Sequence, residues 1–419
     1  MMQRKNTASI AGATTALVLL TALNFLNYID RYILPGVQEM VKAEFRLSDE
    51  RVGVLTFWFF IAYIVAAPLT GWIGDHLPRK PLIVGAALLW SGMNLLTATV
   101  HNFDALLWRH AALGIGEASF GIFAPAVLSD FYPSEQRNRI MTIFNLAVPL
   151  GAALGYLIGG YVGQHHGWRA PFYVSAIPGV VIALLVLFVM REPQRGGSDI
   201  AEKEKLSKKG IVKDLILNPA YATSVLGFAM ATFTLGGISW WIPSFLQRFG
   251  GYDAEHAGFL VGAITVSAGV AGTIAGGVWA ERWLRTNHRA LYLVSGYSSL
   301  LAIPPALLCF FGSPAITLPA LGVAIFCVFL GTGPLNAAVI NSVSARVRAT
   351  ALAGELFILH AIGDAPSPRI IGAVSDATNL RVGLAVTTIA LLVSSALLFY
   401  GARFAPRISS TQSIAGEHA

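Results

Sequence analysis

The chain has 419 residues, of which 55% are hydrophobic and 12% are charged, and its mean hydropathy is +0.63. Soluble domains carry about 25% charged residues, so this composition excludes an ordinary soluble enzyme. It also excludes a disordered chain, which needs low hydrophobicity and high charge. The formal net charge of +7 comes from basic residues in short connections between apolar runs. That distribution is typical of membrane topology and excludes a nucleic-acid-binding groove.

The apolar runs predict an all-α integral membrane protein with twelve transmembrane helices, since about 20 apolar residues span roughly 30 Å of hydrocarbon. The first run follows Arg4 and Lys5 as in a signal peptide, but it continues to Asp30 and Arg31 without a convincing cleavage site, so we expect a retained helix. The expected spans are 13–36, 52–72, 81–100, 105–128, 140–162, 170–190, 220–246, 255–280, 289–311, 316–340, 349–374 and 383–403.

One long polar stretch divides the chain. Residues 1–190 are expected to form an N-terminal six-helix bundle, 191–219 a basic linker, and 220–419 a C-terminal six-helix bundle with a short tail. The excess of Lys and Arg in alternate connections predicts that the linker and both termini are cytoplasmic. The sequence has no Asn-x-Ser/Thr acceptor, which is compatible with a bacterial source and an inner-membrane location.

The two halves repeat each other in sequence. Gly71-Trp-Ile-Gly-Asp75 follows the second span, and Gly277-Val-Trp-Ala-Glu281 follows the eighth at the corresponding position. Two six-span repeats of parallel topology predict alternating access around a site near the bilayer midplane.

The loop from Gly71 to Lys80 resembles the signature loop of the major facilitator superfamily, with His76 and Pro78 where a base and a glycine are usual. Three further motifs are similar to the Spinster-like branch of that superfamily: Asn27-Tyr-Ile-Asp30-Arg31, Gly114-Ile-Gly-Glu117-Ala-Ser119, and His360-Ala-Ile-Gly-Asp364-Ala-Pro-Ser-Pro368. The resemblance covers essentially the whole chain. It implies the twelve-helix fold of the superfamily and transport of lysophospholipids or related single-chain lipid phosphates, commonly linked to a proton gradient.

Ionisable residues inside predicted spans are the candidates for coupling and substrate contact, because such groups usually face a cavity or a partner. Asp30 is expected to accept a proton, and Arg31 to be its partner or an anion contact. The alternative is a structural ion pair near the membrane edge. Glu117 is a second coupling candidate, unless Arg109 or backbone groups satisfy it.

A histidine departs from the family pattern. Where that pattern has an arginine, four residues before the first glycine of Gly-Ile-Gly-Glu, this chain has His110 with Arg109 beside it. Either Arg109 substitutes from a neighbouring helix face, or His110 takes the role titratably. An interfacial histidine without such a role is the alternative.

The eleventh span predicts a break in the helix, because Pro366 and Pro368 cannot donate to the hydrogen-bond ladder. His360 and Asp364 near this break are candidates for the cavity and for gating. Trp240 and Trp241 are candidates for lining a lipid path, with anchoring in an aromatic belt as an equal alternative.

Charged residues after the even-numbered spans form a further candidate set. The resemblance implies that they act as a conformational latch between helices, and the alternative is charge that only sets topology. The latch candidates are Asp75, Arg79, Lys80, Arg137, Glu281 and Arg282.

These observations predict a proton-coupled secondary transporter of amphipathic lipid phosphates, with a transporter of small organic anions or drugs as the alternative. We expect no enzyme activity, because no catalytic set such as His-Glu-x-x-His is present, and no ATP-driven step, because no phosphate loop is present. The expected partners are the lipid substrate, protons and membrane lipids, with no metal, cofactor or nucleic acid. We expect a monomer.

Overall fold

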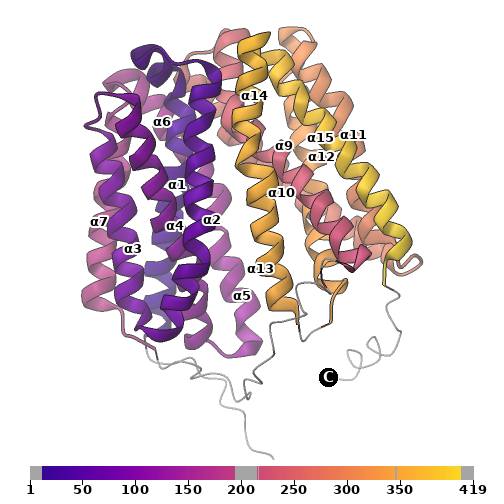
Figure 1. The fold of residues 1–419 in the computed structure, drawn as a ribbon, viewed down its shortest axis with the longest axis horizontal. Coiled ribbons are helices and arrows are strands. Elements are labelled where there is room, and N and C mark those ends of the chain that lie inside the picture. The colour runs from indigo at the N-terminus through magenta and orange to yellow at the C-terminus, as the bar shows by residue number, and fades with distance from the viewer. Residues whose placement is uncertain (1–11, 194–214, 216, 345–346, 407–419) are drawn as a thin grey trace, which may run out of the picture. The chain divides into compact units, whose positions relative to one another are not determined.

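The computed structural model describes residues 12–193, 215, 217–344 and 347–406, and all regular elements within these ranges are helical (Figure 1). Most of the predicted linker and both chain ends lie outside the described residues. The helices are α1 (Ala13–Phe45), α2 (Asp49–His76), α3 (Arg79–Thr97), α4 (Phe103–Phe131), α5 (Ser134–Asn145), α6 (Ala147–His166), α7 (Ala170–Val189), α9 (Pro219–Phe249), α10 (Ala254–Leu284), α11 (Ala290–Phe311), α12 (Pro314–Asn341), α13 (Arg348–Ile358), α14 (Pro366–Ala377) and α15 (Leu380–Gly401).

Within the described ranges, ten segments are long and apolar enough to cross a membrane. One of them, Arg139–His166, combines α6 with most of α5, because the predicted fifth span is interrupted at Leu146. The remaining two predicted spans correspond to α3 and to the broken run of α13 and α14. The prediction of an all-α membrane protein is confirmed.

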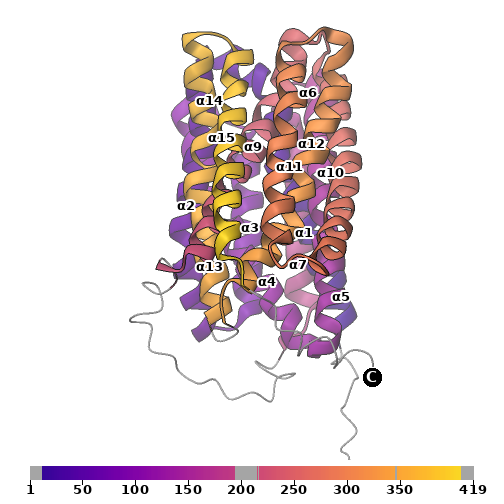
Figure 2. The same ribbon diagram turned by 90° about the vertical axis from the view of Figure 1, so that its right-hand side faces the viewer.

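The helices pack into two units, and four helices, α9, α10, α14 and α15, have residues in both. The first unit contains Met1–Lys205, Ser239–Val266 and Pro368–Gly383; the second contains Leu206–Ile238, Ser267–Ser367 and Leu384–Ala419. In the first unit, α1 packs against α6 and α7, and α4 packs against α2 and α3 (Figure 1). In the second unit, α11 and α12 lie side by side (Figure 2). The predicted division of the chain at the linker stays a prediction.

Three glycines of α6 bring its backbone against α1. A Cβ atom at Gly151, Gly155 or Gly159 would lie 2.7, 2.6 or 2.7 Å from the carbonyl oxygens of Phe25, Ile29 and Ile33, respectively. Real Cβ atoms do not approach this closely, so glycine is required for the packing that small residues allow between membrane helices. This contact fixes the part of α1 that carries Asp30 and Arg31.

The eleventh predicted span is broken, as the prolines indicate. Leu359–Asp364 forms a π-helical turn between α13 and α14, and the amide of Ala365 donates to the carbonyl of His360 over 3.0 Å. Such turns widen the helix locally and are frequent at functional sites.

Replacing Gly155 by alanine should destabilise the protein, although alanine is the better helix former by about 1 kcal/mol. The added methyl group would overlap Ile29 and Tyr32, and overpacking of this kind costs about 1–3 kcal/mol. Thermal unfolding in detergent measures the effect. Gly85→Ala is the matched control, because nothing lies within 4 Å of a Cβ there. Equal melting temperatures for the two variants would contradict this account of the α1–α6 contact.

Candidate functional site

A buried ion pair joins α1 and α4. Arg31 donates from Nε over 2.9 Å and from Nη2 over 2.6 Å to Oε2 of Glu117. The Glu117 side chain is 0% exposed and that of Arg31 is 21% exposed. Among the described residues, none donates to the second carboxylate oxygen, Oε1. Oε1 of Glu117 can therefore take up a proton or accept a further hydrogen bond.

Aromatic rings surround the arginine of this pair. The guanidinium carbon lies 5.0 Å from the ring centroid of Tyr28, 5.3 Å from Phe59 and 5.9 Å from Tyr63. Each is within the range of a cation–π contact, so rings and carboxylate together hold the charge in an apolar setting.

The structure separates His110 from its neighbour Arg109. The His110 ring is buried, with its centroid 5.4 Å from Phe59. It therefore belongs to the group of rings around Arg31. Arg109 points away, and its guanidinium donates to the carbonyl of Leu96 and, over 3.2 Å, to the hydroxyl of Thr99. Of the two neighbours, His110 is therefore the one that lies beside the rings around Arg31, and its role stays a prediction.

Asp30 lies apart from the Arg31–Glu117 pair, although it is the next residue in α1. The residue is 2% exposed, and its nearest polar side chains are Ser175 on α7 and Trp90 and Asn94 on α3. No hydrogen bond from a described residue reaches either carboxylate oxygen. A carboxyl group in such a place is costly to ionise unless water or these donors approach it.

The other predicted cavity residues lie on α9 and on the π-helical turn. The Nδ1 atom of His360 lies 2.8 Å from Oδ2 of Asp364. Trp240 and Trp241 are buried, and the indole of Trp241 donates to the carbonyl of Pro368 over 2.9 Å. The ring of Trp240 has its centroid 6.4 Å from that of His110.

Three of the predicted latch residues make hydrogen bonds or ion pairs at one end of the first unit. We call this end the linker end, because α7 leads into the linker there. Arg79 pairs with Asp130 over 2.5 Å. Arg137 donates to the carbonyls of Ser129, over 2.9 Å, and Tyr132, over 3.2 Å. The carboxylate of Glu192 accepts the amides of Arg79 and Lys80, each over 2.8 Å.

The remaining latch candidates are more exposed. Asp75 is exposed at the end of α2. Glu281 and Arg282 are exposed in the second unit, where Glu281 lies 3.5 Å from Arg285. Sequence reasoning missed Asp130 and Glu192, the two carboxylates that Arg79 contacts.

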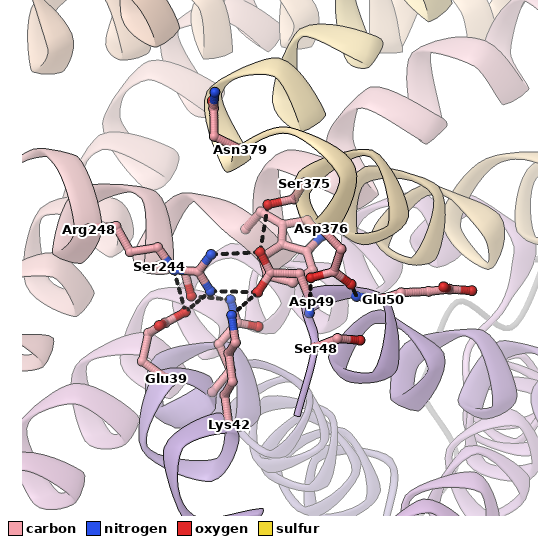
Figure 3. A network of polar contacts seen from close by, with 12 residues as sticks. Glu39, Lys42, Ser48, Asp49, Glu50, Ser244, Arg248, Ser375, Asp376 and Asn379 are labelled. Carbon is pink, nitrogen blue, oxygen red and sulfur yellow. Dashed lines mark hydrogen bonds and ion pairs between the residues drawn. The ribbon is translucent and has the colours of Figure 1, made fainter. Parts of the chain in front are cut away.

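A second polar network lies at the opposite end of the first unit (Figure 3). The Asp49 carboxylate accepts from Arg248 over 2.7 and 2.8 Å, from Ser375 over 2.6 Å, and from Lys42. Arg248 also contacts Glu39, over 2.5 Å. This network therefore joins α1, α2, α9 and α14.

Asp376 completes the network by capping α2. Its two carboxylate oxygens accept the amides of Asp49 and Glu50, each over 2.8 Å (Figure 3). The Ser48 hydroxyl accepts from the amide of Arg51 over 3.3 Å. The first three amides of the helix are thus satisfied by side chains. The segment Ser48-Asp-Glu-Arg is a helix-start signal in the sequence, but it gives no indication of Asp376.

No group of three or more His, Cys, Asp or Glu residues within the described ranges could hold a metal ion.

Known proteins resemble this chain in sequence and in structure. Residues 20–363 match the family model described as Major Facilitator Superfamily. Protein spinster homolog 1 of Homo sapiens is 31% identical over 401 residues, covering 90% of this chain and 75% of that protein. The Xenopus tropicalis homolog is 31% identical over 388 residues, covering 87% and 73%. A bacterial homolog to the human lysosomal transporter Spinster, in an inward-facing and unoccupied conformation, has a TM-score of 0.86 at 24% identity, covering 95% of this chain and 98% of that one. The last match shows the fold.

Replacing Glu117 by glutamine should lower the free energy of unfolding by about 3 kcal/mol, because it leaves the Arg31 charge, which is 21% exposed, without its counter-charge in an apolar setting. Thermal unfolding in detergent measures this. The double variant Arg31→Gln/Glu117→Gln should recover part of the loss. Glu281→Gln, which breaks an exposed pair, should change little. A fully additive double variant would show that the two side chains do not stabilise each other.

Proposed function

Because the chain belongs to the major facilitator superfamily and, within it, to the Spinster family, we propose that it is a proton-coupled secondary transporter of lysophospholipids or related amphipathic lipid phosphates. Members of the family are integral membrane transporters and not enzymes. The observation that supports the finer proposal is the buried Arg31–Glu117 pair together with the separately buried carboxyl group of Asp30, the neighbouring residue in α1.

Arg31 is the proposed contact for the phosphate group. A phosphate oxygen and the Glu117 carboxylate would compete for the same guanidinium, since both make charge-assisted hydrogen bonds to arginine. Protonation of Glu117 would weaken its hold and release Arg31 for the substrate. The rings of Tyr28, Phe59 and Tyr63 offer an apolar surface beside that contact.

Asp30 is the proposed proton acceptor. Protonation would remove a buried charge, and a group whose charge differs between two conformations shifts the balance between them. Protonation of Asp30 or Glu117 is proposed to affect two further groups. One is His110, which lies beside Arg31, and the other is the His360–Asp364 contact. We place the linker end in the cytoplasm of a bacterial inner membrane, with Arg79, Arg137 and their partners as the latch there. We further propose that the chain acts as a monomer.

The alternative substrate is a small organic anion or drug. Arg31 would bind a carboxylate as well as a phosphate. This contact alone therefore does not distinguish a lipid phosphate from a small organic anion as the substrate. Soluble carboxylates that raise the melting temperature, where lysophospholipids do not, would favour the alternative.

Asp30→Asn should abolish gradient-driven uptake while leaving a folded protein, because asparagine matches the neutral form and cannot release a proton. The measurement is uptake of a labelled lysophospholipid into proteoliposomes with and without an inward acid gradient. Asp104→Asn is the matched control, since Asp104 is an exposed carboxylate on α4.

Full gradient-dependent uptake by Asp30→Asn would refute the coupling role. Lack of any protein-dependent lipid movement in the wild type would refute the lipid substrate and leave the organic-anion alternative.

A further inference from the structure

The surroundings of Asp30 contain polar atoms that no described residue satisfies. Besides both Asp30 oxygens, these are Nε1 of Trp90 and both amide atoms of Asn94. All three residues are at most 2% exposed. Buried polar groups are normally hydrogen-bonded. Several unsatisfied groups around one carboxyl group therefore indicate a site whose hydrogen bonds change with the protonation state of that carboxyl group.

The positions of these groups are fixed by packing. A Cβ at Gly116 of α4 would lie 3.1 Å from the backbone nitrogen and from Cβ of Trp90, and the Trp90 ring lies edge-on to Phe120 with centroids 5.2 Å apart. Ser175 is buried on α7, which packs against both α1 and α3. The packing of α3 against α4 and α7, and of α7 against α1, therefore holds these groups around Asp30.

We propose that Trp90, Asn94 and Ser175 form a neutral receptor for Asp30, which positions the carboxyl group and sets the pH at which it takes up a proton. This inference rests on the proposed function, because it deepens the role of Asp30. An indole N–H, an amide N–H and a hydroxyl can each donate to the carboxylate. The Asn94 carbonyl can accept from the protonated carboxyl. An asparagine can thus serve both charge states by using one end of its amide or the other.

The donor groups of Trp90, Asn94 and Ser175 favour binding of a proton by Asp30 over binding of a metal cation. An indole nitrogen is a donor only, so Trp90 would direct a hydrogen atom at any bound cation. Among the described residues, the charged groups near the site are Arg31 on α1 and Glu117 on α4, whose charge acts on Asp30, while the titratable His110 lies further along α4 beside Arg31. Arg31 and Glu117 are paired with each other, which leaves the neutral receptor as the immediate environment of Asp30.

Ser175→Ala and Asn94→Leu test the proposal. Loss of one donor should disfavour the charged carboxylate, so protonation of Asp30 should move to higher pH by about one pH unit. Infrared difference spectroscopy of the purified protein detects the carbonyl stretch of the protonated carboxyl, and Asp30→Asn identifies the band. The pH profile of proteoliposome uptake should move in the same direction.

The matched control is Ser91→Ala. Ser91 lies next to Trp90 on α3, is fully buried, and faces Gly179 of α7. Its removal should leave the midpoint unchanged. An unshifted midpoint in both test variants, or an equal shift in Ser91→Ala, would overturn the proposal. Because the infrared band does not depend on transport, a wild type without lipid uptake would count against the proposed function and not against the receptor.

The network around Asp49 carries a second, independent inference. At this end of the first unit, α2 and α14 approach so closely that a Cβ at Gly372 would lie 2.5 Å from the carbonyl oxygen of Asp49. We infer that the ion pairs of Asp49 and Arg248, together with the Asp376 cap, are a lock that must break for the protein to open at this end (Figure 3).

Cysteine labelling tests the lock. Ser244 is fully buried beside it (Figure 3). Its hydroxyl accepts from the side-chain amide of Gln38. In nanodiscs, maleimide should label Ser244→Cys several-fold faster when Arg248→Gln or Asp376→Asn is added. Arg381→Gln is the matched control, because Arg381 lies at the same end over the Phe249 ring, 4.6 Å from its centroid, and not in the network. Unchanged labelling in both lock variants, or equal acceleration by the control, would overturn the inference.

Discussion

The cost of placing charge in a low-dielectric interior governs the centre of the first unit. Arg31 and Glu117 are tolerable there only as a pair, and the rings around the guanidinium add to that stabilisation. Any event that neutralises Glu117 or offers Arg31 another anion changes the energy of the whole arrangement. In the proposed function, the buried pair is therefore the point at which a proton and an anionic substrate influence each other.

Asp30 and Arg31 are consecutive residues of α1, but their side chains lie against different helices. Successive residues in an α-helix point about 100° apart, so one faces α4 and the other faces α3 and α7. The glycine contact with α6 holds this segment of α1 in place, since Gly155 meets Ile29 and Tyr32 on either side of the two residues. A single segment of α1 thus places Arg31 against Glu117 of α4 and Asp30 near the uncharged polar side chains of α3 and α7.

The sequence predicts the helices because hydropathy and length depend on local composition. It predicts their ends less well: α1 runs to Phe45 rather than 36, since Lys42 and Glu44 are polar yet continue the helix to contact Asp49 and Arg169. Contacts between distant residues leave no local signal. Asp376 caps α2 from more than 300 residues away, and nothing near Asp49 in the sequence indicates it. The choice between Arg109 and His110 likewise depends on which helix face meets Arg31, and only packing decides that.

The contacts at the two ends of the first unit differ in kind from those at its centre. At each end, one carboxylate accepts the first two amides of a helix: Asp376 does so for α2 and Glu192 for α3. Both capping carboxylates are exposed, so water can take the place of either one when its cap opens. The Glu117 carboxylate has no such replacement, because its side chain is inaccessible to solvent. In the proposed function, the ends open and close while the centre changes only when a proton or an anion takes the place of a lost partner. On that proposal, the difference in solvent access links the movement of the ends to the occupancy of the centre, which coupled transport requires.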